Sequence, residues 1–153
     1  MLGVESPFQR AFGKAADSLP ALRAKHVYSE AQRVLDFRKR CEGFGCAAGD
    51  KAELLQTLGE LMNESQDSCR DLYDCSCPEI DQLVKVCRSA GAYGSRLTGA
   101  GWGGCVVSLV AETSVDHFVK QVASQYFGQS VEALTSKIFY SVPGRAAGFV
   151  RVD

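Results

Sequence analysis

The sequence predicts an α+β domain, with several helices packed on a small antiparallel sheet. Two observations carry this prediction. The N-terminal part of the chain repeats apolar side chains at helical spacing. After it, the glycine-rich run 95–104 leads directly into the β-branched apolar run 105–110, which is typical of a buried strand. The order strand, glycine loop, strand indicates a hairpin beside the helices.

The first predicted helix spans about residues 22–41, and one of its faces is apolar. The residues of this face are Ala24, Val27, Tyr28, Ala31, Val34 and Leu35. Glycines at 43, 45 and 49 indicate a loop after this helix. A second helix over residues 54–65 repeats the same spacing and runs or bends on toward Tyr73.

The third predicted helix starts after Ser76, which forms a capping box with Glu79 and places Pro78 in the first turn. This helix stops at Gly91. Its predicted buried residues are Ile80, Leu83, Val84 and Cys87.

The last part of the chain predicts one more helix and two strands. The helix ends at Gly128, and its apolar residues are Val115, Phe118, Val119, Val122 and Tyr126. The strands cover residues 137–142 and 148–152 and are joined through Pro143 and Gly144. Residues 1–19 read as an N-terminal arm or an interdomain remnant, which leaves residues 20–153 as one domain.

Composition fits an ordinary globular domain and excludes several classes of function. A chain of 153 residues is close to the usual domain size. Its net charge of −1 gives no reason to expect nucleic acid or an anionic membrane as a partner. No apolar run approaches the length of a membrane span, and the N-terminus lacks the pattern of a signal peptide. Seven cysteines in such a chain favour reduced thiols and a cytoplasmic location.

The glycine loop carries the candidate site. Glycine loses more backbone entropy on folding than any other residue, so four glycines in six residues indicate positive φ or a very close approach. Free N–H groups in such a loop suit an anion, above all phosphate. The alternative is a tight β-connection in which the glycines serve geometry alone. The candidate residues are Thr98, Gly99, Ala100, Gly101, Gly103 and Gly104.

Two familiar nucleotide motifs do not fit this loop. Gly99, Gly101 and Gly104 match the spacing G-x-G-x-x-G of dinucleotide-binding folds. The loop is followed by a strand, however, and a pyrophosphate would find no helix N-terminus there. A P-loop is excluded because no Gly-Lys-Ser/Thr follows any glycine run.

A polar stripe on the first predicted helix is the second candidate site. Arg23, His26, Glu30 and Arg33 lie within about 80° on a helical wheel, and His26 and Glu30 have the spacing of a helical pair. The stripe is either a solvated face with local ion pairs or a face directed at a cleft or at another domain. His26 has no Ser or Cys partner that would make it a catalytic base.

The cysteines and the single tryptophan are the remaining candidates. No C-x-x-C pair exists, and the two histidines do not fall at zinc-finger spacing, so no metal site is predicted. Cys41, Cys87 and Cys105 lie on apolar faces and are predicted to be small core residues. Trp102, inside the loop, either stacks on a ligand or shields the loop from solvent.

Three stretches together resemble the GHMP kinases and, within them, the galactokinase branch. The run SRLTGAGWGGCVVSLV, residues 95–110, resembles the third conserved motif of that superfamily. The run RAKHVYSE at 23–30 and the stretch 58–83 narrow the resemblance to galactokinases, and the latter is most similar to the N-acetylgalactosamine kinase group. The resemblance covers about residues 20–150 in the same order.

The resemblance implies a C-terminal domain of the GHMP kinase type. Family members carry the sugar-recognition motif, the phosphate loop and the Asp and Arg that act on the sugar in an N-terminal domain, and none of these motifs occurs here. No catalytic residue is therefore expected in this chain, and alone it is expected to be inactive. The resemblance implies ATP with Mg, bound mainly by the N-terminal domain, and galactose or N-acetylgalactosamine as the sugar.

Two functions follow from these observations. The first is the C-terminal domain of an ATP-dependent sugar-1-kinase, which contributes the glycine-rich third motif to the active-site cleft. The alternative is a non-enzymatic, galactokinase-like binding or regulatory module. The face that meets the N-terminal domain would be exposed in this chain, so an N-terminal kinase domain or a second copy is expected as a partner.

Overall fold

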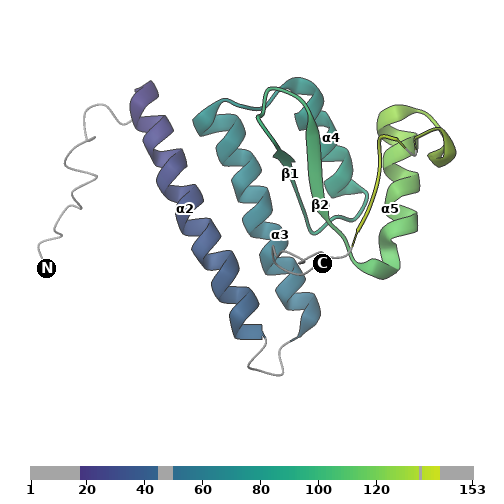
Figure 1. The fold of residues 1–153 in the computed structure, drawn as a ribbon, viewed down its shortest axis with the longest axis horizontal. Helices are drawn as coiled ribbons and strands as arrows, with labels where there is room; N and C mark the ends of the chain where they lie inside the picture. The colour runs from purple at the N-terminus through teal and green to yellow at the C-terminus, as the bar shows by residue number, and fades with distance from the viewer. Residues whose placement is uncertain (1–17, 45–49, 135, 142–153) are drawn as a thin grey trace, which may run out of the picture.

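The computed structural model describes residues 18–44, 50–134 and 136–141. In these residues, helices surround a two-stranded antiparallel sheet, which confirms the predicted α+β class (Figure 1). The α-helices are α2 (Leu19–Phe44), α3 (Lys51–Ser68), α4 (Pro78–Ser89) and α5 (Val115–Val122). The strands are β1 (Gly94–Thr98) and β2 (Cys105–Leu109), and the short helical turns are η1 (Cys69–Tyr73), η2 (Glu112–Ser114), η3 (Ala123–Phe127) and η4 (Val131–Leu134).

Helices α2 and α3 pack side by side at one end of the molecule (Figure 1). The α3 helix begins at Asp50, whose side chain accepts a hydrogen bond of 2.8 Å from the backbone N–H of Ala52. It continues without a break into the π-helical turn η1, which confirms that the second predicted helix extends to Tyr73. The turn ends at Asp74, which has a left-handed backbone (φ 61°).

The α3 helix lies unusually close to β1. A Cβ atom added at Gly59 would overlap the carbonyl group of Tyr93, and one added at Gly94 would overlap the carbonyl group of Gly59. The side chains of Asn63 and Gln66 of α3 also bond the outer edge of the strand, Gln66 by accepting from the N–H of Leu97 (2.7 Å). The amide of Asn63 donates to the carbonyl of Tyr93 (3.1 Å) and accepts from the N–H of Ser95 (3.1 Å). The helix therefore takes the place of a third strand along this edge.

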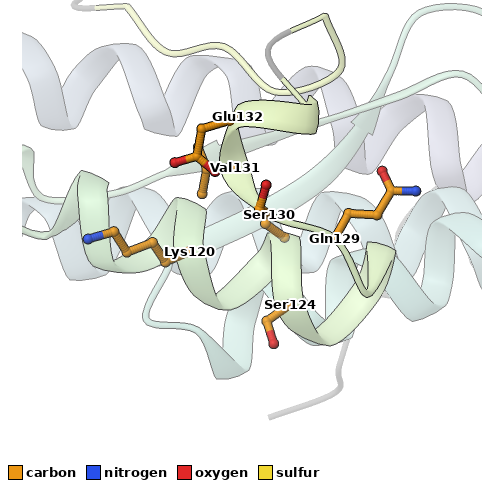
Figure 2. Close-up of a pocket in the computed structure, with 7 residues that line it drawn as sticks. Lys120, Ser124, Gln129, Ser130, Val131 and Glu132 are labelled. Atoms are coloured by element: carbon orange, nitrogen blue, oxygen red, sulfur yellow. The ribbon is translucent and has the colours of Figure 1, made fainter.

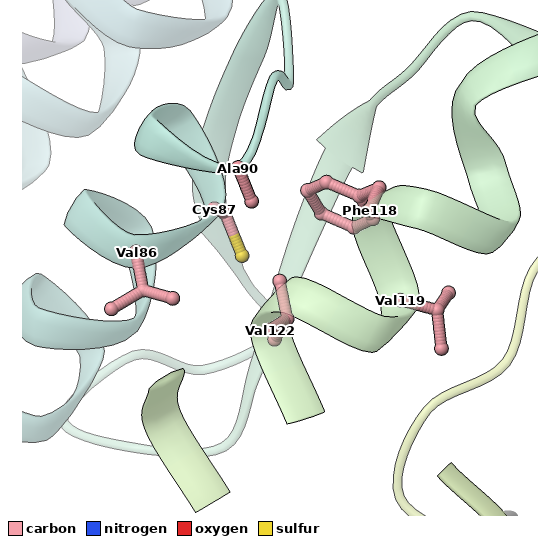
Figure 3. Packing of buried hydrophobic residues seen from close by; sticks show 6 residues of the cluster. All are labelled: Val86, Cys87, Ala90, Phe118, Val119 and Val122. Carbon is pink, nitrogen blue, oxygen red and sulfur yellow. The ribbon is translucent and has the colours of Figure 1, made fainter. Parts of the chain in front are cut away.

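Two apolar clusters hold the remaining elements. In the first, Cys87 of α4 and Ala90 directly after it face Phe118 and Val122 of α5, as Figure 3 shows. The second lies under the other end of α4, between this helix, η1 and β1. Its members are Cys69, Cys75, Ile80, Val84 and Leu97. In α4, Ile80, Val84 and Cys87 are buried as predicted, whereas Leu83 is only partly buried.

Two predictions about local structure are wrong. The N-cap of α4 is Cys77, and the hydroxyl of Ser76 bonds Asp81 (2.7 Å), so Ser76 forms no capping box with Glu79. Residues 137–141 form no strand, because the backbone N–H groups of Lys137 and Ile138 turn back to Leu134 (2.8 and 2.9 Å). Pro78 occupies the first turn of α4 as predicted, and Gly128 ends the continuous helical segment of α5 and η3 with φ 61°.

Several predictions fall outside the described residues. They concern most of the arm 1–19, the glycines at 45 and 49, and the strand 148–152. Within the described part of the chain, no helix is both long and apolar enough to span a membrane.

Candidate functional site

The glycine loop joins β1 to β2 and has an unusual backbone. Gly99, Gly101, Gly103 and Gly104 all have positive φ, at 92°, 87°, 140° and 86°. Trp102 between them also has positive φ (55°), which is rare for a bulky residue. The glycines are therefore required by the backbone path of the hairpin, which is the geometric role considered for them.

Trp102, at the centre of the loop, holds the loop to the residues that follow η1. The backbone N–H of Trp102 donates to the carbonyl of Cys75 (2.7 Å), and its indole N–H donates to the carbonyl of Asp74 (3.0 Å). A Cβ atom at Gly101 would lie 2.7 Å from the same Cys75 oxygen, so only glycine fits there. These bonds fix a tryptophan in a strained conformation, and such strain concentrates at functional sites.

The opposite side of the loop is open. Nothing lies within 4 Å of a Cβ added at Gly99 or Gly103, and Thr98, Ala100 and Gly104 are exposed. The Trp102 side chain is 64% exposed, although its indole N–H is bonded. The loop thus has a fixed side and a free side, and the free side offers backbone and one aromatic ring to a ligand.

The polar stripe of α2 points inward, so the solvated-face interpretation is wrong. Glu30 is its centre: one carboxylate oxygen accepts from Arg33 (2.8 Å), and the other accepts from Ser65 of α3 (2.8 Å) and from Arg96 of β1 (3.4 Å). Burial alone would raise the pKa of Glu30. The hydrogen bonds of Ser65 and Arg33 and the charges of Arg33 and Arg96 outweigh burial and lower this pKa.

The other two stripe residues pack on η1. His26 shares a hydrogen bond of 2.9 Å with the Ser68 hydroxyl, so the expectation that it has no Ser partner is wrong. The His26 ring also stacks on the ring of Tyr73, with the ring centroids 4.7 Å apart. Burial lowers the pKa of His26 despite the nearby Glu30. Arg23 donates to the carbonyl of Leu72 and forms an ion pair with Asp74 (3.6 Å). The stripe therefore supports the turn that holds the glycine loop, and its position at a cleft stays a prediction.

Sequence reasoning missed the residues that connect these parts. Asp74 and Cys75 bond Trp102 through backbone carbonyls, which no side-chain pattern reveals. Arg96 is the only one with a sequence signal, since it is a charged residue inside an otherwise uncharged strand.

A pocket of about 280 Å³ lies elsewhere, at the end of α5. Figure 2 shows Lys120 of α5, Ser124 of η3 and Glu132 of η4 around it. No residue of the glycine loop or of the polar stripe lines it. The sequence analysis proposed no site here, and the pocket contains no cluster of chemically paired groups that would assign one.

The six cysteines in the described part of the chain are free thiols in different settings. Cys87 is buried, as predicted, but Cys41 and Cys105 are exposed, so their assignment to the core is wrong. Cys41 belongs to the outward part of α2, and Cys105 begins the strand directly after the open loop. Burial, with a contribution from Cys75, raises the pKa of Cys69 to about 11. In the described part of the chain, no group of His, Cys, Asp and Glu could hold a metal ion.

Comparison with known proteins decides the family. The family described as GHMP kinases C terminal matches residues 51–128, which contain α3, the hairpin and the whole glycine loop. This chain belongs to the GHMP kinase family. The match places the glycine loop inside the family's C-terminal domain, whereas α2 precedes the matched residues.

Galactokinases are the curated relatives of this GHMP kinase chain. The galactokinase of Dictyostelium discoideum is 41% identical over 145 residues, which cover 84% of this chain and 29% of that protein. The galactokinase of Saccharomyces cerevisiae is 56% identical over 88 residues, which cover 58% of this chain and 16% of that protein. The chain therefore spans less than a third of the length of these relatives.

Two solved structures share the fold. The galactokinase of Lactococcus lactis, complexed with galactose, gives a TM-score of 0.64 at 30% identity and covers 84% of this chain and 34% of that chain. The mevalonate kinase of L. major, in complex with R-mevalonate, gives a TM-score of 0.59 at 26% identity and covers 81% of this chain and 36% of that chain. These likenesses confirm the predicted fold type, while the finer resemblance to N-acetylgalactosamine kinases stays a prediction.

Proposed function

We propose that this chain is the C-terminal part of an ATP-dependent sugar-1-kinase of the galactokinase type, and that its glycine loop lines the cleft where phosphoryl transfer occurs. The sugar would be galactose or N-acetylgalactosamine, and Mg would accompany ATP. In phosphoryl transfer, most of the catalysis comes from positioning and from stabilising charge on the transferred group. A glycine loop suits this task because its N–H groups approach an anion without side-chain bulk.

The main observation in support of the proposal is that the glycine loop has one fixed side and one free side. Its fixed side is bonded to Asp74 and Cys75, and its free side has open space at Gly99 and Gly103. A loop that only closed a hairpin would need neither the strained Trp102 nor the two bonds that hold it. A preorganised backbone is what electrostatic catalysis requires of such a group.

We also propose that the chain alone transfers no phosphate. Its relatives are more than three times as long as the segment they share with it. The loop would supply one wall of a site, and the other wall would come from the N-terminal part of the kinase.

The test places the chain in a complete kinase. Residues 20–153 replace the corresponding segment of the Dictyostelium galactokinase, and the chimera and the isolated chain are assayed with ATP·Mg and either sugar. We expect the chimera to phosphorylate a sugar and the isolated chain to be inactive. Because Trp102 is the only tryptophan of the chain, its fluorescence in the isolated chain also reports ATP or ADP binding directly.

A matched pair of substitutions separates the loop from the fold. Gly103→Ala adds a methyl group on the open side at φ 140°, whereas Gly91→Ala adds one to open space at φ 104°, after the end of α4. We expect the first to lower kcat of the chimera at least about tenfold, which corresponds to about 1.4 kcal/mol of barrier, and the second to leave it unchanged. Nucleotide binding by the isolated chain, with an inactive chimera, would favour the binding module instead.

A further inference from the structure

The outer face of α2 is apolar and exposed. Val27, Val34 and Leu35 are 56%, 66% and 59% exposed. With Ala24 and Ala31, these side chains form one stripe, because helix residues three, four and seven positions apart lie on the same face. Figure 1 shows that the other described helices and the sheet all lie on one side of α2.

The stripe cannot turn inward, because the opposite face of the helix is already occupied. Glu30 is bonded to Ser65 of α3 and to Arg96 of β1, and Arg23 is bonded to η1. Rotating α2 would break these bonds and bury charges without partners. The helix is thus amphipathic, and in the described part of the chain it packs on α3 and η1 through its polar side.

We propose that the outer stripe of α2 is the docking surface for the N-terminal part of the kinase, which in the relatives lies outside the segment they share with this chain; this inference rests on the proposed function. The Dictyostelium galactokinase has more than two thirds of its length outside the shared segment, since the match covers 29% of it. The α2 helix also precedes the family match at 51–128, so it is the element nearest to that portion along the chain.

The chemistry of the stripe describes the surface that fits it. The small residues Ala24 and Ala31 alternate with Val27, Val34 and Leu35, which lets another helix or sheet approach closely. The exposed cations Lys25 and Lys39 border the stripe on one edge. The partner surface is therefore apolar with an acidic rim. A second copy of the chain fits less well, because pairing two such faces brings these cations together.

Cysteine labelling tests the docking directly. Val34→Cys and Lys85→Cys are introduced one at a time into the isolated chain and into the full-length chimera, and the labelling rate of each new thiol is followed by peptide mass spectrometry. The V34C thiol should react at least about tenfold more slowly in the chimera than in the isolated chain, because accessibility controls thiol reactivity. The K85C thiol, at an exposed position of α4 outside the stripe and its edge, should react at similar rates in both.

Each outcome decides the inference. Equal V34C rates in the two proteins overturn it. A V34C rate in the isolated chain that falls with protein concentration shows that a second copy covers the stripe, and this also overturns it. Kinase activity is measured on the same chimera, so that protection of V34C without activity rejects the proposed function and keeps the docking surface. Kinase activity without protection of V34C supports the proposed function and rejects the docking surface.

Discussion

The side chain of Gln66 accepts a hydrogen bond of 2.7 Å from the backbone N–H of Leu97. Gln66 is completely buried, and its amide nitrogen also donates to Ser76 and to Asp81, each at 3.2 Å. One residue thereby joins α3, β1 and the start of α4. Together with Asn63, one helical turn earlier, it pairs the strand edge that would otherwise be left without partners.

The first prediction concerns the loss of the Gln66 side chain. Gln66→Ala leaves the buried N–H of Leu97 without its acceptor, and a buried donor without a partner costs about 1–3 kcal/mol. We expect the free energy of unfolding, measured with urea, to fall by about that amount. Gln56→Ala is the control, because Gln56 lies on the same helix and bonds only the exposed Glu60. Equal losses of unfolding free energy in the two variants would show that Gln66 does not stabilise the contact between these elements.

The second prediction concerns the close approach of α3 and β1. Gly59→Ala places a methyl group against the carbonyl of Tyr93, which is backbone and cannot move aside. Overpacking of this kind typically costs about 1–3 kcal/mol. We expect a lower thermal midpoint for Gly59→Ala, measured by circular dichroism. Gly43→Ala, which meets no atom within 4 Å, should not lower it.

The elements of the fold could be predicted from the sequence because local patterns specify them. The helical spacing in α3 and α4 and the β-branched run after the glycines lead to the observed segments. The orientation of α2 could not be predicted this way. An apolar face usually marks the core side of a helix, but here Ser65, Ser68 and Arg96 on neighbouring elements bond the polar side instead.

The candidate site could likewise be predicted from the sequence only in part. The glycines at positive φ were predictable, because few other residues adopt such a backbone. The bonds from Trp102 to Asp74 and Cys75 were not, because carbonyl groups leave no sequence signal. The capping box at Ser76 failed for a related reason: the hydroxyl has a tertiary partner in Asp81, and a local pattern cannot reveal it.

The third prediction concerns thiol reactivity. Cys41 and Cys105 are exposed, whereas Cys69 is buried and its pKa is raised to about 11, first by burial and then by Cys75. Because the thiolate is the reactive form, alkylation at pH 8 should modify Cys41 and Cys105 first and Cys69 only when the protein unfolds. Peptide mass spectrometry at successive times measures the order. Early modification of Cys69 in folded protein would contradict its burial.

The fourth prediction follows from the lowered pKa of Glu30. The ordinary value is 4.5, and in the folded protein the hydrogen bonds of Ser65 and Arg33 and the charges of Arg33 and Arg96 outweigh burial and hold the pKa below it. A carboxylate with a depressed pKa contributes stability above its unfolded value and loses it as the pH falls through the folded value. Glu30→Gln should therefore be less stable than wild type at pH 7, by about 1–2 kcal/mol.

The sign of the pH dependence is what tests this account. Between pH 7 and pH 5, Glu30 is ionised in both the folded and the unfolded states and adds no pH dependence of its own. The stability difference between wild type and Glu30→Gln widens slightly there, because Glu30 raises the folded-state pKa of His26 and Gln does not. Below about pH 4.5 the difference should shrink, since the unfolded chain binds a proton at Glu30 before the folded protein does. Urea unfolding at each pH measures the difference, and Glu64→Gln, on the exposed side of α3, is the control. A difference that keeps growing below about pH 4.5 would mean that burial, and not the ion pairs, dominates the carboxylate.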